Sequence, residues 1–271
     1  MTSQLEKAER FRDLHLGPDT FFIPNPWDAG SARLLQGLGY QALATTSSGF
    51  AFTLGRLDGQ VSLDEKLAHI RALSEATDIP LSADLENCFA DEPAAAAETI
   101  RLAAEAGAVG GSIEDYSNNP DDPIYDFDLA VARVQAAVAM AQSLPFPFTL
   151  TARAENLLHG VGDIDEAIRR LQAFAAAGAD VLYAPGLRTL ADVKRVTSAV
   201  NKPVNVLGTM VAGASLADFS AAGVKRVSVG GSMTFATVAK AIEAGRSLLE
   251  TGNYDWASNR LRPGELAGLL G

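Results

Sequence analysis

Short apolar runs alternate with longer amphipathic segments along nearly the whole sequence. Most of the runs have the length and composition of buried β-strands, whereas the segments between them repeat apolar residues at helical spacing. The predicted strands are 21–24, 41–45, 79–87, 110–114, 148–152, 180–183, 203–207 and 224–229. The predicted helices are 2–16, 29–38, 62–77, 93–107, 126–142, 163–178, 189–200, a short one from Ser215, and 232–251.

Eight strand-helix units in a chain of this length predict an α/β fold, a closed (β/α)8 TIM barrel. An open doubly wound sheet would also alternate strands and helices, but seldom to eight units without a dinucleotide-binding fingerprint. The glycine pairs Gly110-Gly111 and Gly230-Gly231 lack the spacing of that fingerprint. No linker or low-complexity stretch divides the chain, so residues 1–271 are interpreted as one barrel domain with a helical C-terminal tail after 253.

Local signals mark several helix starts. The segment from Ser62 to Glu65 has the capping-box pattern, and Pro93 suits the first residue of a helix. Asp28 and Asp91 are interpreted as N-caps. The glycine-containing segment 46–61 is expected to be a long loop.

Composition and charge exclude several classes of protein. The net charge of −11 argues against a nucleic-acid partner. No apolar run reaches about 18 residues, so no membrane span is expected, and the first residues lack a signal-peptide core. A cytoplasmic location is therefore expected. Cys88 is the single cysteine, which excludes an internal disulfide and a thiolate zinc cluster.

Charged residues follow three of the predicted strands directly. Asp84 ends one strand, Glu114 the next and Arg153 the one after. Ser82, Asp84 and Glu86 alternate in sequence, so an extended strand would point all three to one face. Active sites of parallel α/β proteins lie at the carboxyl ends of the strands, so Asp84 and Glu114 predict a metal site. An all-oxygen site suits Mg²⁺ or Mn²⁺ and does not suit zinc.

Other candidate residues have two interpretations each. Arg153 either pairs with Glu114 or Glu155, or presents its fork to a substrate carboxylate or phosphate. The segment 45–50, rich in Thr and Ser, is either a plain turn or an anion-binding nest of backbone N–H groups. Asp58 belongs either to a turn or to the site. Cys88 and His159 are interpreted as structural.

These residues together resemble the isocitrate lyase/phosphoenolpyruvate mutase superfamily, in its phosphoenolpyruvate phosphonomutase-like branch. The matching motifs, in order, are Pro24-Asn-Pro-Trp-Asp28, Thr46-Ser-Ser-Gly49, Asp58, Ser82-Ala-Asp84, Ile113-Glu-Asp115 and Thr151-Ala-Arg153. The resemblance implies a barrel whose last helix is exchanged between paired subunits, usually in a homotetramer arranged as a dimer of dimers. It also implies Mg²⁺ and a 2-oxo acid whose neighbouring C–C or P–C bond is broken or made.

The same resemblance assigns roles to individual residues. It implies Asp84 as the main metal ligand, with Asp58 and Glu114 reaching the metal through water. It implies that backbone groups of Ser47, Ser48 and Gly49, together with the side chain of Arg153, hold the substrate carboxylate. Trp27 would wall the pocket. Arg153, Asp58 and Asn118, the last on the loop over the site, are the catalytic candidates.

Two departures from the family pattern change the expected reaction. Many members carry Asp-Ala-Asp where this chain has Ser82-Ala-Asp84, and Glu86 is the acid that could replace the missing charge. The lyases carry a cysteine acid/base on the loop after Glu114, whereas segment 116–125 here has no Cys, His or Lys. Cleavage of isocitrate or methylisocitrate is therefore not expected. The sequence predicts a Mg²⁺-dependent lyase of a small 2-oxo acid, such as oxaloacetate or phosphonopyruvate. The alternative is a non-catalytic barrel that binds a metal-chelated dicarboxylate such as oxalate.

Overall fold

The computed structural model describes residues 2–270 and shows a nearly closed (β/α)8 barrel, as predicted. The eight parallel strands are β1 (Phe21–Ile23), β2 (Leu43–Ala44), β3 (Leu81–Ala83), β4 (Gly110–Glu114), β5 (Thr149–Arg153), β6 (Val181–Tyr183), β7 (Val204–Leu207) and β8 (Arg226–Ser228). Their order in the sheet is β1-β8-β7-β6-β5-β4-β3-β2. Between β1 and β2 the gap is bridged by a hydrogen bond from the Ala44 N–H to the Pro24 carbonyl, 3.0 Å long.

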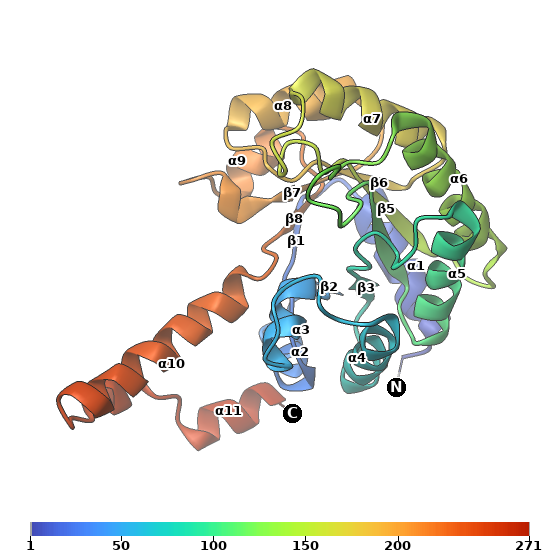
Figure 1. Cartoon of the computed structure of the whole chain (residues 1–271). Coiled ribbons are helices and arrows are strands. Elements are labelled where there is room, and N and C mark those ends of the chain that lie inside the picture. The colour runs from blue at the N-terminus through green and yellow to red at the C-terminus, as the bar shows by residue number, and fades with distance from the viewer. Residues whose placement is uncertain (1, 271) are drawn as a thin grey trace.

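Helices surround the sheet, as Figure 1 shows. They are α1 (Gln4–Leu16), α2 (Ala29–Gly37), α3 (Ser47–Thr53), α4 (Leu63–Ala76), α5 (Pro93–Glu105), α6 (Phe127–Ser143), α7 (Ile164–Ala176), α8 (Leu190–Ala199), α9 (Leu216–Ala221), α10 (Ser232–Glu250) and α11 (Pro263–Leu270). The main core cluster lies between the sheet and its helices, where apolar side chains from both are buried.

Most of the expected helix starts are confirmed. Ser62 and Glu65 form a reciprocal capping box on α4, and Pro93 is the first residue of α5. Asp28 caps α2 through its side chain. The N-cap prediction for Asp91 is wrong, because its carboxylate accepts a hydrogen bond from the Tyr125 hydroxyl instead.

The expectation of a long loop over residues 46–61 is also wrong, because α3 occupies its first half. Thr46 caps this helix, and its Oγ1 accepts a hydrogen bond from the Gly49 N–H at 3.2 Å. Serine and glycine are poor helix formers, so local propensity hides the helix. Gly49 is required here by packing, since a Cβ at this position would lie 2.5 Å from Thr234 Oγ1.

Helix α1 lies across the amino-terminal end of the barrel and buries His15 against it. The His15 Nδ1 donates to the Phe11 carbonyl at 2.7 Å, so Nε2 is free to accept from Arg226 Nη1 at 3.3 Å. Burial, together with the nearby Arg226 charge, lowers the pKa of His15 to about 3. The folded protein therefore holds this imidazole neutral.

This neutral histidine predicts a loss of stability in mild acid. The unfolded chain binds a proton at His15 below its ordinary pKa of 6.5, whereas the folded chain does not until about pH 3. Stability is therefore lost as the pH falls through this window, by about 2 kcal/mol at pH 5 from this residue. Urea unfolding of His15→Gln at pH 7 and pH 5 should lack this part of the pH dependence. His159→Gln, at an exposed position, should retain it; equal pH dependence in parent and His15→Gln would contradict the assignment.

The C-terminal helices leave the barrel. Figure 1 shows α10 projecting away from the strands, and α11 returning beside α2. Thr234 is the one buried residue of α10, while Phe235, Ile242 and Leu249 are exposed. Within residues 2–270, no helix is both long and apolar enough to cross a membrane.

Candidate active site

The carboxyl ends of β3, β4 and β5 bring the predicted charged residues together. Glu114 and Arg153 are register partners on β4 and β5, and Asp84 follows β3 directly. The side chains of Asp84 and Arg153 line a pocket of about 200 Å³ at this end of the barrel. That volume is below the roughly 300–1,000 Å³ typical of sites for drug-sized ligands, so the pocket suits a small metabolite.

Arg153 is the centre of the cluster. Its Nη1 lies 3.0 Å from Asp84 Oδ1, its Nη2 lies 3.1 Å from Glu114 Oε2, and its Nε lies 2.7 Å from Glu155 Oε1. The ion-pair interpretation of Arg153 is therefore confirmed. Three carboxylates share one guanidinium, so the cation is more than neutralised by its neighbours.

Asp84 is held by the segment that leads into α3. Its Oδ2 accepts from the Ser47 N–H at 3.1 Å, and its own N–H donates to Thr45 Oγ1 at 2.8 Å. Ser112 Oγ lies 3.4 Å from Asp84 Oδ1. Ser47 and Ser48 both line the pocket. The segment 45–50 is thus no plain turn, since one of its backbone N–H groups binds a carboxylate.

Burial and charge set the protonation of the two central acids differently. Burial alone would raise the pKa of Asp84, but Arg153, Lys66 and the Ser47 hydrogen bonds outweigh it, so this pKa lies below its usual value. Burial raises the pKa of Glu114 well above its usual value, and the neighbouring carboxylates add to that effect. Asp84 is therefore the anion of the pair, and Glu114 is the acid that holds its proton most readily.

The alternation had predicted that Glu86 shares a face with Ser82 and Asp84, and this prediction is wrong. The strand ends at Ala83, and Glu86 has a left-handed φ of 53°, which turns its side chain elsewhere. Its Oε1 lies 3.9 Å from the ammonium group of Lys66, a fully buried lysine on α4. Glu86 thus lies next to the pocket, paired with Lys66, and burial raises its pKa to about 7.

The other predicted site residues are spread around the pocket. Asp58 lines the pocket beside Ser47, and burial of its carboxylate raises its pKa, with Asp84 adding to the rise. Asn118 lies exposed on the loop over residues 116–125, with a left-handed φ of 60°. Trp27 lines a separate cavity next to α10 and not the acidic pocket. His69 donates from Nε2 to the Trp27 carbonyl at 3.0 Å.

The floor of the pocket is polar, and the sequence did not predict it. Polar side chains from β5 to β8 line it, namely Thr151, Tyr183, Asn205, Arg226 and Ser228. A signal was present, because the predicted strand 224–229 carries Lys225, Arg226 and Ser228 among its valines. Charged side chains inside a barrel need polar partners, so Arg226 indicated a polar barrel interior.

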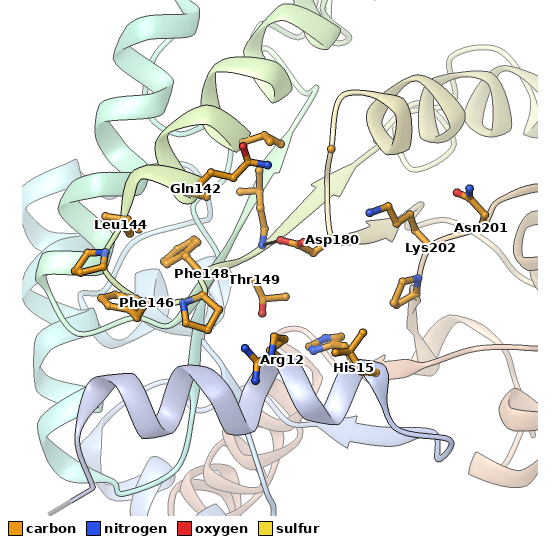
Figure 2. Close-up of a pocket in the computed structure, with 18 residues that line it drawn as sticks. Arg12, His15, Gln142, Leu144, Phe146, Phe148, Thr149, Asp180, Asn201 and Lys202 are labelled. Carbon is orange, nitrogen blue, oxygen red and sulfur yellow. Dashed lines mark hydrogen bonds between the residues drawn. The ribbon is translucent and has the colours of Figure 1, made fainter.

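A larger cavity, of about 670 Å³, lies at the opposite end of the barrel. Figure 2 shows Arg12 and His15 of α1 below it, with Phe146 and Phe148 on one side and Lys202 on the other. Asp180 is the single acid among its lining residues. Because (β/α)8 enzymes carry their chemistry at the carboxyl ends of the strands, we assign the site to the smaller, acidic pocket.

The acidic pocket suits a divalent cation because of its charge, although its side chains do not form a ready-made set of metal ligands. Within residues 2–270, no three Asp, Glu, His or Cys side chains converge as a preformed metal cage. The five acids in and around the pocket, Asp58, Asp84, Glu86, Glu114 and Glu155, nevertheless outnumber its three cations, Arg153, Lys66 and Arg226. Buried carboxylates in such excess favour a bound cation, and oxygen donors suit Mg²⁺. The residues around Asp84 thus fit a divalent ion by the charge and the oxygen donors that they supply.

The barrel fold and the acidic pocket at the carboxyl ends of its strands place the protein in the class of (β/α)8-barrel enzymes. The sequence matches the phosphoenolpyruvate phosphomutase family over residues 11–249, so the chain belongs to that family, within the isocitrate lyase/phosphoenolpyruvate mutase superfamily of lyases and mutases.

Individual relatives agree with this placement. A Burkholderia cenocepacia J2315 protein of known structure is 50% identical, with a TM-score of 0.95 over 97% of this chain and 95% of that one. The 2-methylisocitrate lyase of Escherichia coli is 33% identical over 65% of this chain and 61% of its own length. The oxaloacetate decarboxylase of Paraburkholderia xenovorans is 29% identical over 91% and 83%, respectively.

Proposed function

We propose that the protein is a Mg²⁺-dependent lyase of a small 2-oxo acid, breaking a C–C or P–C bond next to the developing enolate. One observation carries the proposal: Asp58, Asp84 and Arg153 line a pocket of about 200 Å³, and two further acids, Glu114 and Glu155, contact Arg153 beside it. Relatives that act on small oxo acids support it, among them the oxaloacetate decarboxylase.

In this proposal Asp84 holds the metal, and Asp58 and Glu114 contact it through water. When bound, Mg²⁺ supplies electrostatic stabilisation to the negative charge that develops on the enolate oxygen. Arg153 fixes Asp84 and Glu114 and offers its guanidinium to the substrate carboxylate. Ser47 and Ser48 line the same pocket, so their backbone, followed by that of Gly49, would contact the other carboxylate oxygen.

The protein's own residues suit a reaction that needs no strong acid/base to break the bond. In the decarboxylation of oxaloacetate, the C–C electron pair becomes the pyruvate enolate, CO₂ leaves, and the enolate carbon takes a proton from solvent. Asn118 lies on the loop beside the site and would contribute a polar group when that loop covers the pocket. The loop is closed by the bridge between Tyr116 and Ile124.

A screen of 2-oxo acids and phosphonates tests the proposal. Purified protein with Mg²⁺ should release pyruvate from oxaloacetate, or phosphate from phosphonopyruvate, at a rate on the order of 1 s⁻¹ or more. No release from any of these substrates would contradict the proposed function.

The absence of an acid/base on the loop favours one other function. Segment 116–125 contains no Cys, His or Lys, the usual donors matched to neutral pH. A barrel that binds a metal-chelated dicarboxylate such as oxalate, without turning it over, would need none. Oxalate binding that EDTA removes, in a protein inactive on the whole screen, would identify this function.

Cys88 should not take part in the reaction. Its thiol is fully buried, its Sγ lies 3.8 Å from the Ser112 carbonyl oxygen, and burial raises its pKa to about 12. Such a thiol is neither a nucleophile nor a proton donor at neutral pH. Cys88→Ser should therefore change kcat by less than about tenfold, below the effect of removing a general acid. A greater loss, with the unfolding midpoint unchanged, would place the thiol in the mechanism.

We also propose that α10 is exchanged between paired subunits, in a dimer of dimers. The exposed apolar residues Phe235, Ile242 and Leu249 on this projecting helix would be covered by a second copy of the chain. Light scattering after size-exclusion chromatography should give an even number of chains. A monomer at micromolar concentration would contradict this part of the proposal.

A further inference from the structure

Arg226 is a buried cation on the pocket floor that lacks an acidic partner. Its Nε donates to Asn205 Oδ1 at 2.8 Å, its Nη2 to Thr151 Oγ1 at 3.0 Å, and its Nη1 to His15 Nε2 at 3.3 Å. All three acceptors are neutral. Within residues 2–270, no Asp or Glu forms an ion pair with this guanidinium.

The two arginines of the pocket therefore differ in the charge of their partners. Arg153 shares its charge with three carboxylates, which contact it directly. Arg226 keeps its charge, and a guanidinium has five N–H donors, of which its protein partners use three. Burial lowers the pKa of Arg226 to about 10, which leaves it protonated at neutral pH. A buried charge of this kind is stabilised most by a ligand of opposite sign.

The position of Arg226 suits the far end of a short substrate. It binds Thr151, which lies two residues before Arg153 on the same strand, a rise of about 6.6 Å. That rise is comparable to the length of a four-carbon dicarboxylate. Neutral hydroxyl and amide groups of Tyr183, Asn205 and Ser228 border the same floor, and Asn205 Nδ2 donates to Ser228 Oγ at 3.0 Å.

We propose that Arg226 binds a second anionic group, a carboxylate or a phosphonate, at the end of the substrate remote from the 2-oxo carboxylate. The site then selects dianionic oxo acids over monoanionic ones such as pyruvate. This inference rests on the proposed function, because it assumes that the 2-oxo end of the substrate lies at Asp84 and Arg153. His15, Asn205 and Thr151 act as positioning residues that orient the guanidinium.

Calorimetric titration with three probes tests the inference in the presence of Mg²⁺. Pyruvate has no second anionic group, 3,3-difluorooxaloacetate carries a carboxylate and phosphonopyruvate a phosphonate. The parent should bind at least one dianion about 10- to 100-fold more tightly than pyruvate, as expected for a charge-assisted bond. The tighter of the two identifies the natural group. Arg226→Met should lose this preference and keep its affinity for pyruvate. Lys202→Met, which removes a cation from the opposite cavity, should behave like the parent.

Each contrary outcome has a separate meaning. Equal binding of pyruvate and both dianions by the parent, or an unchanged preference in Arg226→Met, overturns the role of Arg226 and leaves the proposed function standing. Failure of the parent to bind any of the three overturns both. If Arg226→Met does not fold, a crystal structure of the parent with 3,3-difluorooxaloacetate decides. A distal carboxylate hydrogen-bonded to Arg226 supports the inference, and one bound elsewhere overturns it.

Discussion

Replacing Asp84 by alanine is expected to abolish Mg²⁺ binding and to lower kcat by more than about 100-fold. Removing a residue that merely supports a metal ligand already lowers affinity or activity by about 10- to 100-fold, and Asp84 is proposed as the direct ligand. Its carboxylate is the one held ionised by Arg153, Lys66 and Ser47. Titration of EDTA-treated protein with Mg²⁺, followed by steady-state kinetics, measures both effects.

The fold should survive this change. Arg153 keeps Glu114 and Glu155 as partners when Asp84 is removed, and one acid fewer relieves repulsion within the cluster. The unfolding midpoint should therefore stay near that of the parent. Glu9→Gln, on the exposed side of α1, is the control and should bind Mg²⁺ normally. Mg²⁺ affinity in Asp84→Ala equal to that of the parent would remove Asp84 from the metal site.

Replacing Arg153 by methionine is expected to have the largest effect on stability. Asp84, Glu114 and Glu155 would lose the one cation that all three contact, and breaking a buried pair in this way destabilises proteins by about 3–5 kcal/mol. Substrate binding should be lost as well. Urea unfolding at pH 7 measures the stability, and calorimetry with pyruvate measures the binding.

The pH dependence of this variant provides its control. Without Arg153 the pKa of Glu114, which burial already raises, rises further above its unfolded value, and the depressed pKa of Asp84 rises as well, so the folded variant binds more protons than the folded parent. Stability is then present at low pH and is lost as the pH rises through the folded pKa values. The deficit of Arg153→Met relative to the parent should therefore shrink from pH 7 to pH 5. Arg153→Lys, which keeps a charge, should show a smaller deficit. Parent-like unfolding of Arg153→Met at pH 7 would mean that the cluster is not an ion-pair network.

The sequence predicted the parts of the site that depend on strand ends. Asp84, Glu114 and Arg153 each follow an apolar run, and parallel strands must bring such ends to one edge, so their proximity follows from topology alone. Their exact partners did not follow. Whether Arg153 paired with acids or stood free depends on side-chain positions a few ångströms apart, which periodicity does not encode.

Other features were missed for local reasons. The helix α3 is hidden in a Ser- and Gly-rich segment because its stability comes from the Thr46 cap and from packing against Thr234. Asp91 resembled an N-cap, but a tertiary partner, Tyr125, competes for its carboxylate. Arg226 was visible as one of two adjacent charges in a valine-rich strand, yet only the structure shows that its partners in the barrel interior are all neutral.

The most direct test of the proposed function is the dependence of oxaloacetate turnover on Mg²⁺ in a single preparation. Protein treated with EDTA and then freed of it should form almost no pyruvate above the spontaneous rate, and adding Mg²⁺ should restore turnover to the order of 1 s⁻¹ or more. The Asp84→Ala protein should not respond to Mg²⁺. Enzymatic pyruvate formation that is the same with and without Mg²⁺, or that persists in Asp84→Ala, would contradict a metal-dependent lyase centred on Asp84.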